Sequence, residues 1–161
     1  GFYSWSGLRY FLYEYELYLQ DNANMKVSWE DFNKRKKEDT IEHIYPQSPN
    51  DIYWKNRFGH LKPSEKRQYL NSLGNLLLLN RSKNSKLQNY DFDKKKCLLN
   101  KDGKEIGYYN GSYSEIEVSK HKEWTPDEIK KRGLLMLQFM EERWKFSFDN
   151  WNISKEDILF P

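Results

Sequence analysis

The chain has 161 residues, of which 32% are charged and 17% aromatic, and its formal net charge is +3. This length fits one domain whose core needs no disulfide, and Cys97, the only cysteine, excludes an internal disulfide and a CxxC zinc motif. Apolar runs stay well short of the roughly 20 residues that a membrane helix requires, so we expect a cytoplasmic protein with no membrane partner.

The first predicted element is a helix over residues 7–20, because apolar residues recur there with helical spacing. Its stripe consists of Leu8, Phe11, Leu12, Tyr15 and Leu19. Asp21 and Asn22 are expected to end this helix. Ser28 then predicts the start of a second helix, which runs into the basic residues at 34–37.

Two short strands are predicted in the next part of the chain. Residues 39–45 form the first, and Pro46 ends it. After a loop, a helix is expected from Pro63 to Leu73. Residues 75–80 contain four consecutive leucines and are tightly bounded by Gly74 and a polar stretch, so we interpret them as a buried strand.

The remaining chain predicts two helices separated by a glycine-containing segment that forms a loop or an irregular strand. Ser82 is expected to cap a helix that runs towards Leu99, and Thr125, Pro126 and Glu128 are typical of the start of a helix over residues 125–145. The predicted fold class is therefore α+β and mostly helical.

Three side chains in this pattern suit the hydrolysis of a phosphodiester. His43 follows Glu42 directly, and an imidazole can accept a proton from water at neutral pH. Glu42 and Asn84 offer hard oxygen donors, which favour one Mg²⁺ or Mn²⁺ over zinc. Adjacent residues of a regular strand point to opposite faces, so we expect Glu42 and His43 at the end of their strand.

The combination resembles the HNH, or ββα-metal, nucleases, and most closely the C-terminal domain of GmrSD-type modification-dependent restriction and phage-defence proteins. The resemblance rests on Glu42-His43-Ile44, Pro46-Gln47, Leu73-Gly74-Asn75-Leu76, Leu79, Asn84-Ser85, Asn89, Phe92, Lys95, Trp124, Ile129, Arg132 and Leu135. It implies a ββα-metal core at about 38–100 within one HNH domain over residues 1–161, with flanking helices at 7–20 and 125–145. It also implies that Glu42 and Asn84 are metal ligands, that His43 is the general base and that Asn75 braces the loop behind it.

Basic residues near these motifs are the predicted contacts to nucleic acid. They are Arg81, Lys83, Lys86, Lys94 and Lys95. We expect Lys86 and Lys95 on the helix that carries Asn84, where they either contact the scissile strand or merely solvate that face.

The predicted function is that of a metal-dependent DNA endonuclease domain that nicks DNA in restriction or antiviral defence, with no small-molecule cofactor. Two alternatives stay open: a catalytically inactive nucleic-acid-binding module, and an RNA-directed nuclease. Because the chain starts without Met, we expect it to be a C-terminal fragment, and the family places a recognition or NTPase domain before it.

Overall fold

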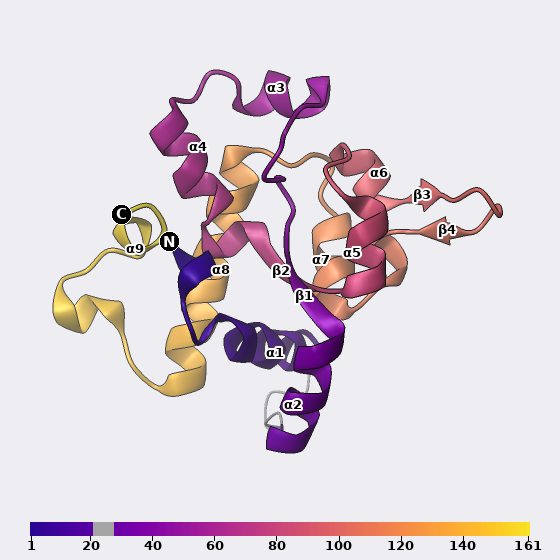
Figure 1. Cartoon of the computed structure of the whole chain (residues 1–161). Coiled ribbons are helices and arrows are strands. Elements are labelled where there is room, and N and C mark those ends of the chain that lie inside the picture. Colours follow the sequence, from indigo (N-terminus) through magenta and orange to yellow (C-terminus); the bar gives the residue numbers. More distant parts are fainter. Residues whose placement is uncertain (21–27) are drawn as a thin grey trace.

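The computed structural model describes residues 1–20 and 28–161 (Figure 1). Helices dominate these residues and short antiparallel strand pairs lie among them, so the fold is α+β and mostly helical, as predicted. The α-helices are α1 Leu8–Leu19, α2 Trp29–Glu38, α3 Ile52–Phe58, α4 Pro63–Leu70, α5 Arg81–Leu87, α6 Phe92–Lys96, α7 Tyr113–Ser119, α8 Pro126–Trp144 and α9 Lys155–Leu159. The strands are β1 Asp39–His43, β2 Leu76–Asn80, β3 Leu98–Leu99 and β4 Glu105–Ile106. The 3-10 helices are η1 Phe2–Ser4, η2 Leu73–Asn75, η3 Tyr108–Asn110 and η4 Phe148–Trp151.

The two predicted strands pair with each other at the centre of the fold. β1 and β2 are antiparallel, with Asp39 opposite Asn80 and His43 opposite Leu76. α5 follows β2 directly, because the Asn80 side chain accepts a hydrogen bond from the Ser82 backbone N–H and so caps the helix. This arrangement is the predicted strand–strand–helix core, although Asn80 rather than Ser82 is the capping residue.

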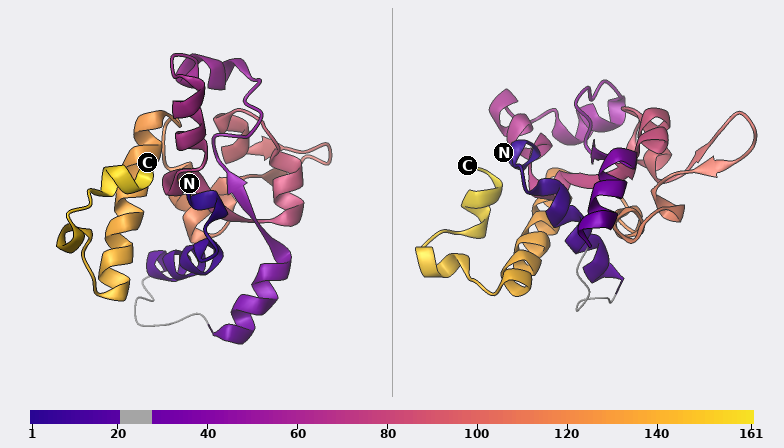
Figure 2. Two further views of the ribbon diagram at one scale, coloured as in Figure 1. Left: turned by 60° about the vertical axis from the view of Figure 1, so that its left-hand side comes forward. Right: turned by 60° about the horizontal axis from the view of Figure 1, so that its bottom comes forward.

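The run of four leucines in β2 is explained by burial on both faces of the strand. Alternate side chains of a strand point to opposite faces. Leu76 and Leu78 join a core cluster with residues of α1, α8 and α9, whereas Leu77 and Leu79 join a second cluster with residues of α3, α5, α6 and α8. The strand pair therefore separates two hydrophobic cores, with α8 and α5 on opposite sides of it (Figures 1 and 2).

The helix α8 fixes the start of β2 by close backbone contact. A Cβ atom on Gly74 would lie only 1.9 Å from the carbonyl oxygen of Ile129, so this position requires glycine. The Arg132 guanidinium donates 2.9 Å hydrogen bonds to the carbonyl oxygens of Gly74 and Leu76, and it pairs with Glu117 at 3.1 Å. Arg132 is thus a buried structural residue that holds the segment around Asn75.

Several boundaries differ from the prediction. Residues 81–99 form two helices rather than one, because Gln88 has a φ of 42° and Asp91 caps the new helix α6 by accepting a hydrogen bond from the Lys94 backbone. The helix at Pro63 ends at Leu70, and α3, α7 and α9 were not predicted. The predicted helix break at Asp21 and Asn22 lies outside the described residues. Among those described, no helix combines the length and apolar character needed to cross a bilayer.

Candidate active site

The predicted catalytic residues of β1 and α5 surround one cavity. Its volume is about 160 Å³, and it lies where β1 ends. The lining side chains come from η1, β1, the loop after β1 and the region of α5: Tyr3, Ile41, Glu42, His43, Pro46, Gln47, Asn84, Gln88 and Asn89. His43 is the last residue of β1 and Glu42 the one before it, so both border the cavity from the end of the strand.

Glu42 is a buried carboxylate with hydrogen bonds on one side. Its Oε1 accepts a hydrogen bond from Lys95 Nζ at 2.5 Å and another from the Tyr108 hydroxyl at 2.9 Å. Within the described residues both of its hydrogen bonds go to Oε1, so Oε2 remains available to a ligand in the cavity. Burial and the nearby Glu42 charge raise the pKa of Tyr108 well above its ordinary value, so this hydroxyl stays a donor.

Lys95 is hydrogen-bonded to the end of β1. Besides Glu42, its ammonium group donates to the backbone oxygens of His43 at 3.0 Å and Ile44 at 3.1 Å, so all three protons have acceptors. Burial lowers the pKa of Lys95, and the Glu42 charge opposes this shift. The lysine therefore holds the Glu42 carboxylate together with the backbone of His43 and Ile44.

His43 is 6% exposed, and its Nε2 is buried without a hydrogen-bond partner among the described residues. Burial lowers the pKa of the imidazole to about 4; a side-chain hydrogen bond with Asn71 raises it, and the Lys95 charge lowers it further. The ring is therefore neutral at neutral pH, with a nitrogen lone pair available. The ring of Tyr3 lies against it, with 4.5 Å between the ring centroids.

Asn84 reaches the same cavity from α5. Its Nδ2 donates to the Thr40 hydroxyl at 2.8 Å, and this hydroxyl in turn donates to the Leu79 carbonyl oxygen at 3.0 Å. The amide is thereby oriented by β1 and β2, and Oδ1 is the atom left for another partner. The short helix α5 is linked to the strands through this contact.

The Asn75 side chain is hydrogen-bonded to the loop after β1. Its Oδ1 accepts from the Tyr45 backbone N–H at 2.7 Å and from the Trp124 indole at 3.2 Å, and its Nδ2 donates to the Tyr45 and Leu70 carbonyl oxygens at 3.0 Å. The side chain is fully buried, so it acts on the site by holding the backbone two residues beyond His43.

The donors in this cavity fit a hard divalent cation that keeps several water ligands. Glu42 and Asn84 both line the cavity and both carry oxygen donors, and no group of three or more His, Cys, Asp or Glu side chains suited to a metal occurs in residues 1–20 and 28–161. A dedicated zinc site would need such a cluster. The residues present instead suit Mg²⁺ or Mn²⁺, which retain water and bind through few protein oxygens.

The predicted nucleic-acid contacts differ widely in their surroundings. Arg81 and Lys86 are exposed on α5. Lys83 is paired with Glu115 at 2.7 Å, and Lys94 is paired with Asp91 at 2.7 Å. Lys95 is fully buried and lies on α6 rather than on the helix of Asn84, so the prediction that it contacts DNA is wrong. Its ammonium group forms an ion pair with Glu42 instead.

Comparison with protein families matches residues 1–139 to the GmrSD restriction endonucleases, C-terminal domain. The chain belongs to this family. No curated protein and no solved structure matches it. Membership of the GmrSD family identifies a restriction-endonuclease-type nuclease domain, and it agrees with the resemblance found in the sequence.

Sequence reasoning missed one residue of the cavity and one ion pair behind it. Tyr3 lies 40 positions before His43, and no local pattern links the two; only the packing of η1 brings them together. The ion pair between Glu42 and Lys95 had a weak signal, because both belonged to the family motif, but lysine is rarely buried and its exposure was assumed.

Proposed function

We propose that this GmrSD-family domain is a metal-dependent DNA endonuclease of the HNH type. The observation that carries the proposal is one cavity bordered by Glu42, His43 and Asn84, in which the imidazole is buried and neutral and its Nε2 has no hydrogen-bond partner among the described residues. A proton acceptor and two hard oxygen donors in one cavity are the groups that water needs to attack a phosphodiester.

In this proposal His43 takes the proton from the attacking water. Lys95 and Asn75 hold the backbone from the His43 carbonyl to Tyr45, which keeps the imidazole in one orientation without side-chain reorganisation during the reaction. Glu42 and Asn84 would hold one Mg²⁺ or Mn²⁺, which supplies stabilisation of the negative charge that develops on the phosphate and on the departing 3′-oxygen. The products would carry 5′-phosphate ends.

Arg81 and Lys86 are the exposed cations on the helix that carries Asn84, so they are our candidates for contacts to the DNA backbone. Phosphate contacts position a duplex and carry little sequence information. We therefore propose that recognition of modified DNA comes from another part of the full-length protein, and that this domain alone nicks DNA slowly and with little preference.

The experiment is plasmid cleavage by the 161-residue chain in EDTA, Mg²⁺, Mn²⁺ or Zn²⁺, followed by end-group analysis. Cleavage with Mg²⁺ or Mn²⁺ that leaves 5′-phosphates supports the proposal. Equal cleavage in EDTA would refute the metal requirement, and cleavage with Zn²⁺ alone would contradict the oxygen-donor site. Parallel reactions on RNA and on modified DNA test the choice of substrate and the division of labour.

A further inference from the structure

Tyr3 is a cavity residue that lies outside the strand–strand–helix core. It belongs to η1, close to the N-terminus, and it lines the cavity together with Glu42, His43 and Asn84. Its ring is tilted 50° to the imidazole of His43 at a centroid distance of 4.5 Å, within the range of favourable aromatic contacts. Tyr3 thus forms one wall of the cavity.

The segment that carries Tyr3 is held to the protein at a residue that also acts on His43. The backbone N–H of Phe2 donates to the carbonyl oxygen of Asn71 at 2.9 Å, and the side chain of Asn71 raises the pKa of His43. A Cβ atom on Gly1 would lie 2.8 Å from Cβ of Asn71, so the chain passes close by. The position of Tyr3 over the imidazole is therefore fixed by the fold.

The hydroxyl of Tyr3 is free for a ligand. Tyr3 is 44% exposed, and its hydroxyl makes no hydrogen bond to any residue in the described part of the chain. By contrast, Tyr13, Tyr15 and Tyr108 each donate to a carboxylate. A half-exposed phenol at the edge of a cavity can donate to a non-bridging phosphate oxygen, and the acceptor's charge strengthens such a bond.

We propose that Tyr3 is a positioning residue with two functions: its ring holds and shields the His43 imidazole, and its hydroxyl binds the phosphodiester backbone. The second function rests on the nuclease function proposed above. Substitution separates the two, because Tyr3→Phe keeps the ring and removes the hydroxyl, whereas Tyr3→Ala removes both. Tyr113→Ala is the control, since Tyr113 is 53% exposed on α7 and does not line the cavity.

The first test needs no DNA. Diethyl pyrocarbonate is added in EDTA, and the modification rate of each of the three histidines is followed by mass spectrometry, with the exposed His60 as internal reference. Loss of one aromatic contact predicts a rate at His43 that is about 2- to 12-fold higher in Tyr3→Ala. Tyr3→Phe and Tyr113→Ala should react like the wild type. An unchanged rate in Tyr3→Ala overturns the shielding function.

The second test measures binding of a short duplex in EDTA and then cleavage with Mg²⁺. Tyr3→Phe should weaken binding about 2- to 12-fold, the range expected for one hydrogen bond, and leave kcat close to that of the wild type. Tyr3→Ala should weaken binding equally and also lower kcat. Wild-type affinity in both variants overturns the hydroxyl function. If the wild-type domain cuts nothing, the proposed nuclease function fails, whereas the modification and binding assays still decide the two functions of Tyr3.

Discussion

Glu42 and Glu16 are both buried carboxylates, with exposures of 5% and 8%, yet their hydrogen bonds differ in kind. Glu16, on α1, accepts bonds on both oxygens: its Oε1 from the Tyr113 backbone at 2.8 Å, its Oε2 from the Ser114 backbone at 2.8 Å and the Ser114 hydroxyl at 2.6 Å. It accepts from the free N–H groups of Tyr113 and Ser114 at the start of α7. Glu42 is bonded through Oε1 alone and borders a cavity.

Burial of a carboxylate therefore does not by itself mark a site. Glu16 has its bonds distributed over both oxygens, which is what a structural link between two helices requires. Glu42 has its bonds on one oxygen, and the other accepts none from the described residues, as the proposed metal ligand requires. The distribution of hydrogen bonds over the two oxygens therefore separates the two roles.

The largest expected effect tests whether the region around Glu42 is catalytic. His43→Ala should lower single-turnover cleavage by about 10³-fold, because the general base acts in the transition state. Glu42→Ala should also be slow but should recover partly in excess Mn²⁺, whereas His43→Ala should not. Glu16→Ala should cut normally per folded molecule. Normal cleavage by His43→Ala would contradict the assigned roles. So would an equal recovery of cleavage by His43→Ala and Glu42→Ala in excess Mn²⁺. His60→Ala is the matched control.

The second effect concerns stability. Lys95→Met should lower the free energy of unfolding by about 3–5 kcal/mol, because it leaves the Glu42 carboxylate buried without its cation. Urea denaturation measures this change. Lys94→Met is the control. The Lys94 ammonium group is half exposed in its ion pair with Asp91, so its loss should change the free energy of unfolding little. If Lys95→Met were as stable as the wild type, the account of Glu42 as a carboxylate held by one buried ion pair would be wrong.

The double variant Lys95→Met with Glu42→Gln tests the same ion pair by removing both of its charges. Removing both charges leaves a neutral amide in place of an unpaired carboxylate, so most of the lost stability should return. Metal-dependent cleavage should not return, because the anionic donor is gone. A structural pair would recover in stability and leave cleavage unaffected, so the two measurements together separate structure from catalysis.

A smaller effect is the dependence of stability on pH through His43. In the unfolded chain the imidazole gains a proton below its ordinary pKa of 6.5, whereas in the fold burial holds its pKa at about 4. The unfolded state therefore binds more protons in this window, and the free energy of unfolding should fall as pH drops from 6.5 towards 4, by at most about 1.4 kcal/mol per pH unit.

The measurement is urea denaturation in EDTA across this pH range, for wild type and His43→Gln. The wild-type curve should fall more steeply, because only the wild type contains the buried imidazole. His60→Gln, at an exposed position, should follow the wild type. Parallel curves for wild type and His43→Gln would mean that the imidazole is as well hydrated in the fold as in the unfolded chain.

The sequence predicts the parts of this fold that depend on local pattern. Both strands of the core, α1 and α8 follow from apolar spacing and capping residues, and the family motif brings Glu42, His43 and Asn84 together. The break at Gln88 was missed because no Gly or Pro lies between Ser82 and Leu99 to mark it in the sequence.

The rest of the site depends on contacts between distant segments. Lys95 lies 53 positions after Glu42 and Tyr3 lies 40 before His43, and neither contact leaves a periodic trace in the sequence. Lysine is nearly always exposed, so the expectation for Lys95 followed the general rule. Its burial is stabilised by three acceptors that only the folded end of β1 supplies.

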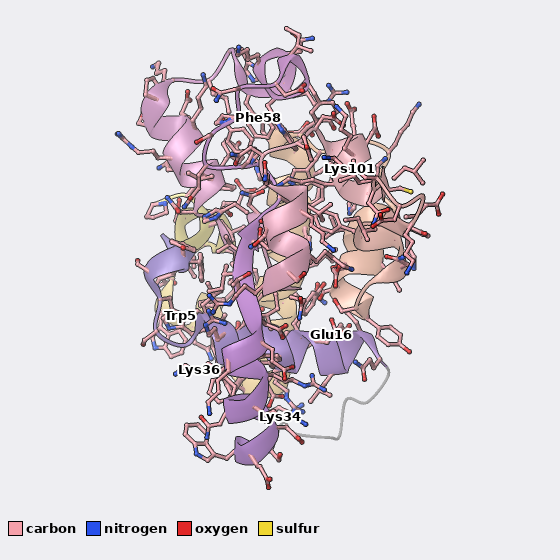
Figure 3. All side chains as sticks on the ribbon, turned by 45° about the vertical axis from the view of Figure 1, so that its right-hand side comes forward. Trp5, Glu16, Lys34, Lys36, Phe58 and Lys101 are labelled. Carbon is pink, nitrogen blue, oxygen red and sulfur yellow. The ribbon has the colours of Figure 1, made fainter. Side chains whose placement is uncertain are left out.

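The smallest effect concerns how the surface around the cavity binds DNA. Arg81 and Lys86 are exposed on α5, whereas Lys34 and Lys36 lie on α2, at the opposite end of the molecule from Phe58 (Figure 3). If α5 faces the duplex, each lost phosphate contact should reduce the slope of log affinity against log salt by about 0.9. Arg81→Gln with Lys86→Gln should therefore flatten the slope by about 1.8.

The double variant Lys34→Gln with Lys36→Gln removes the same charge and should leave the slope unchanged. The assay is duplex binding in EDTA over a salt series, on several unrelated sequences, and the loss should be the same for each because phosphate contacts carry no sequence information. The opposite ranking of the two variants would move the DNA-binding surface to α2 and away from the cavity that Glu42 borders.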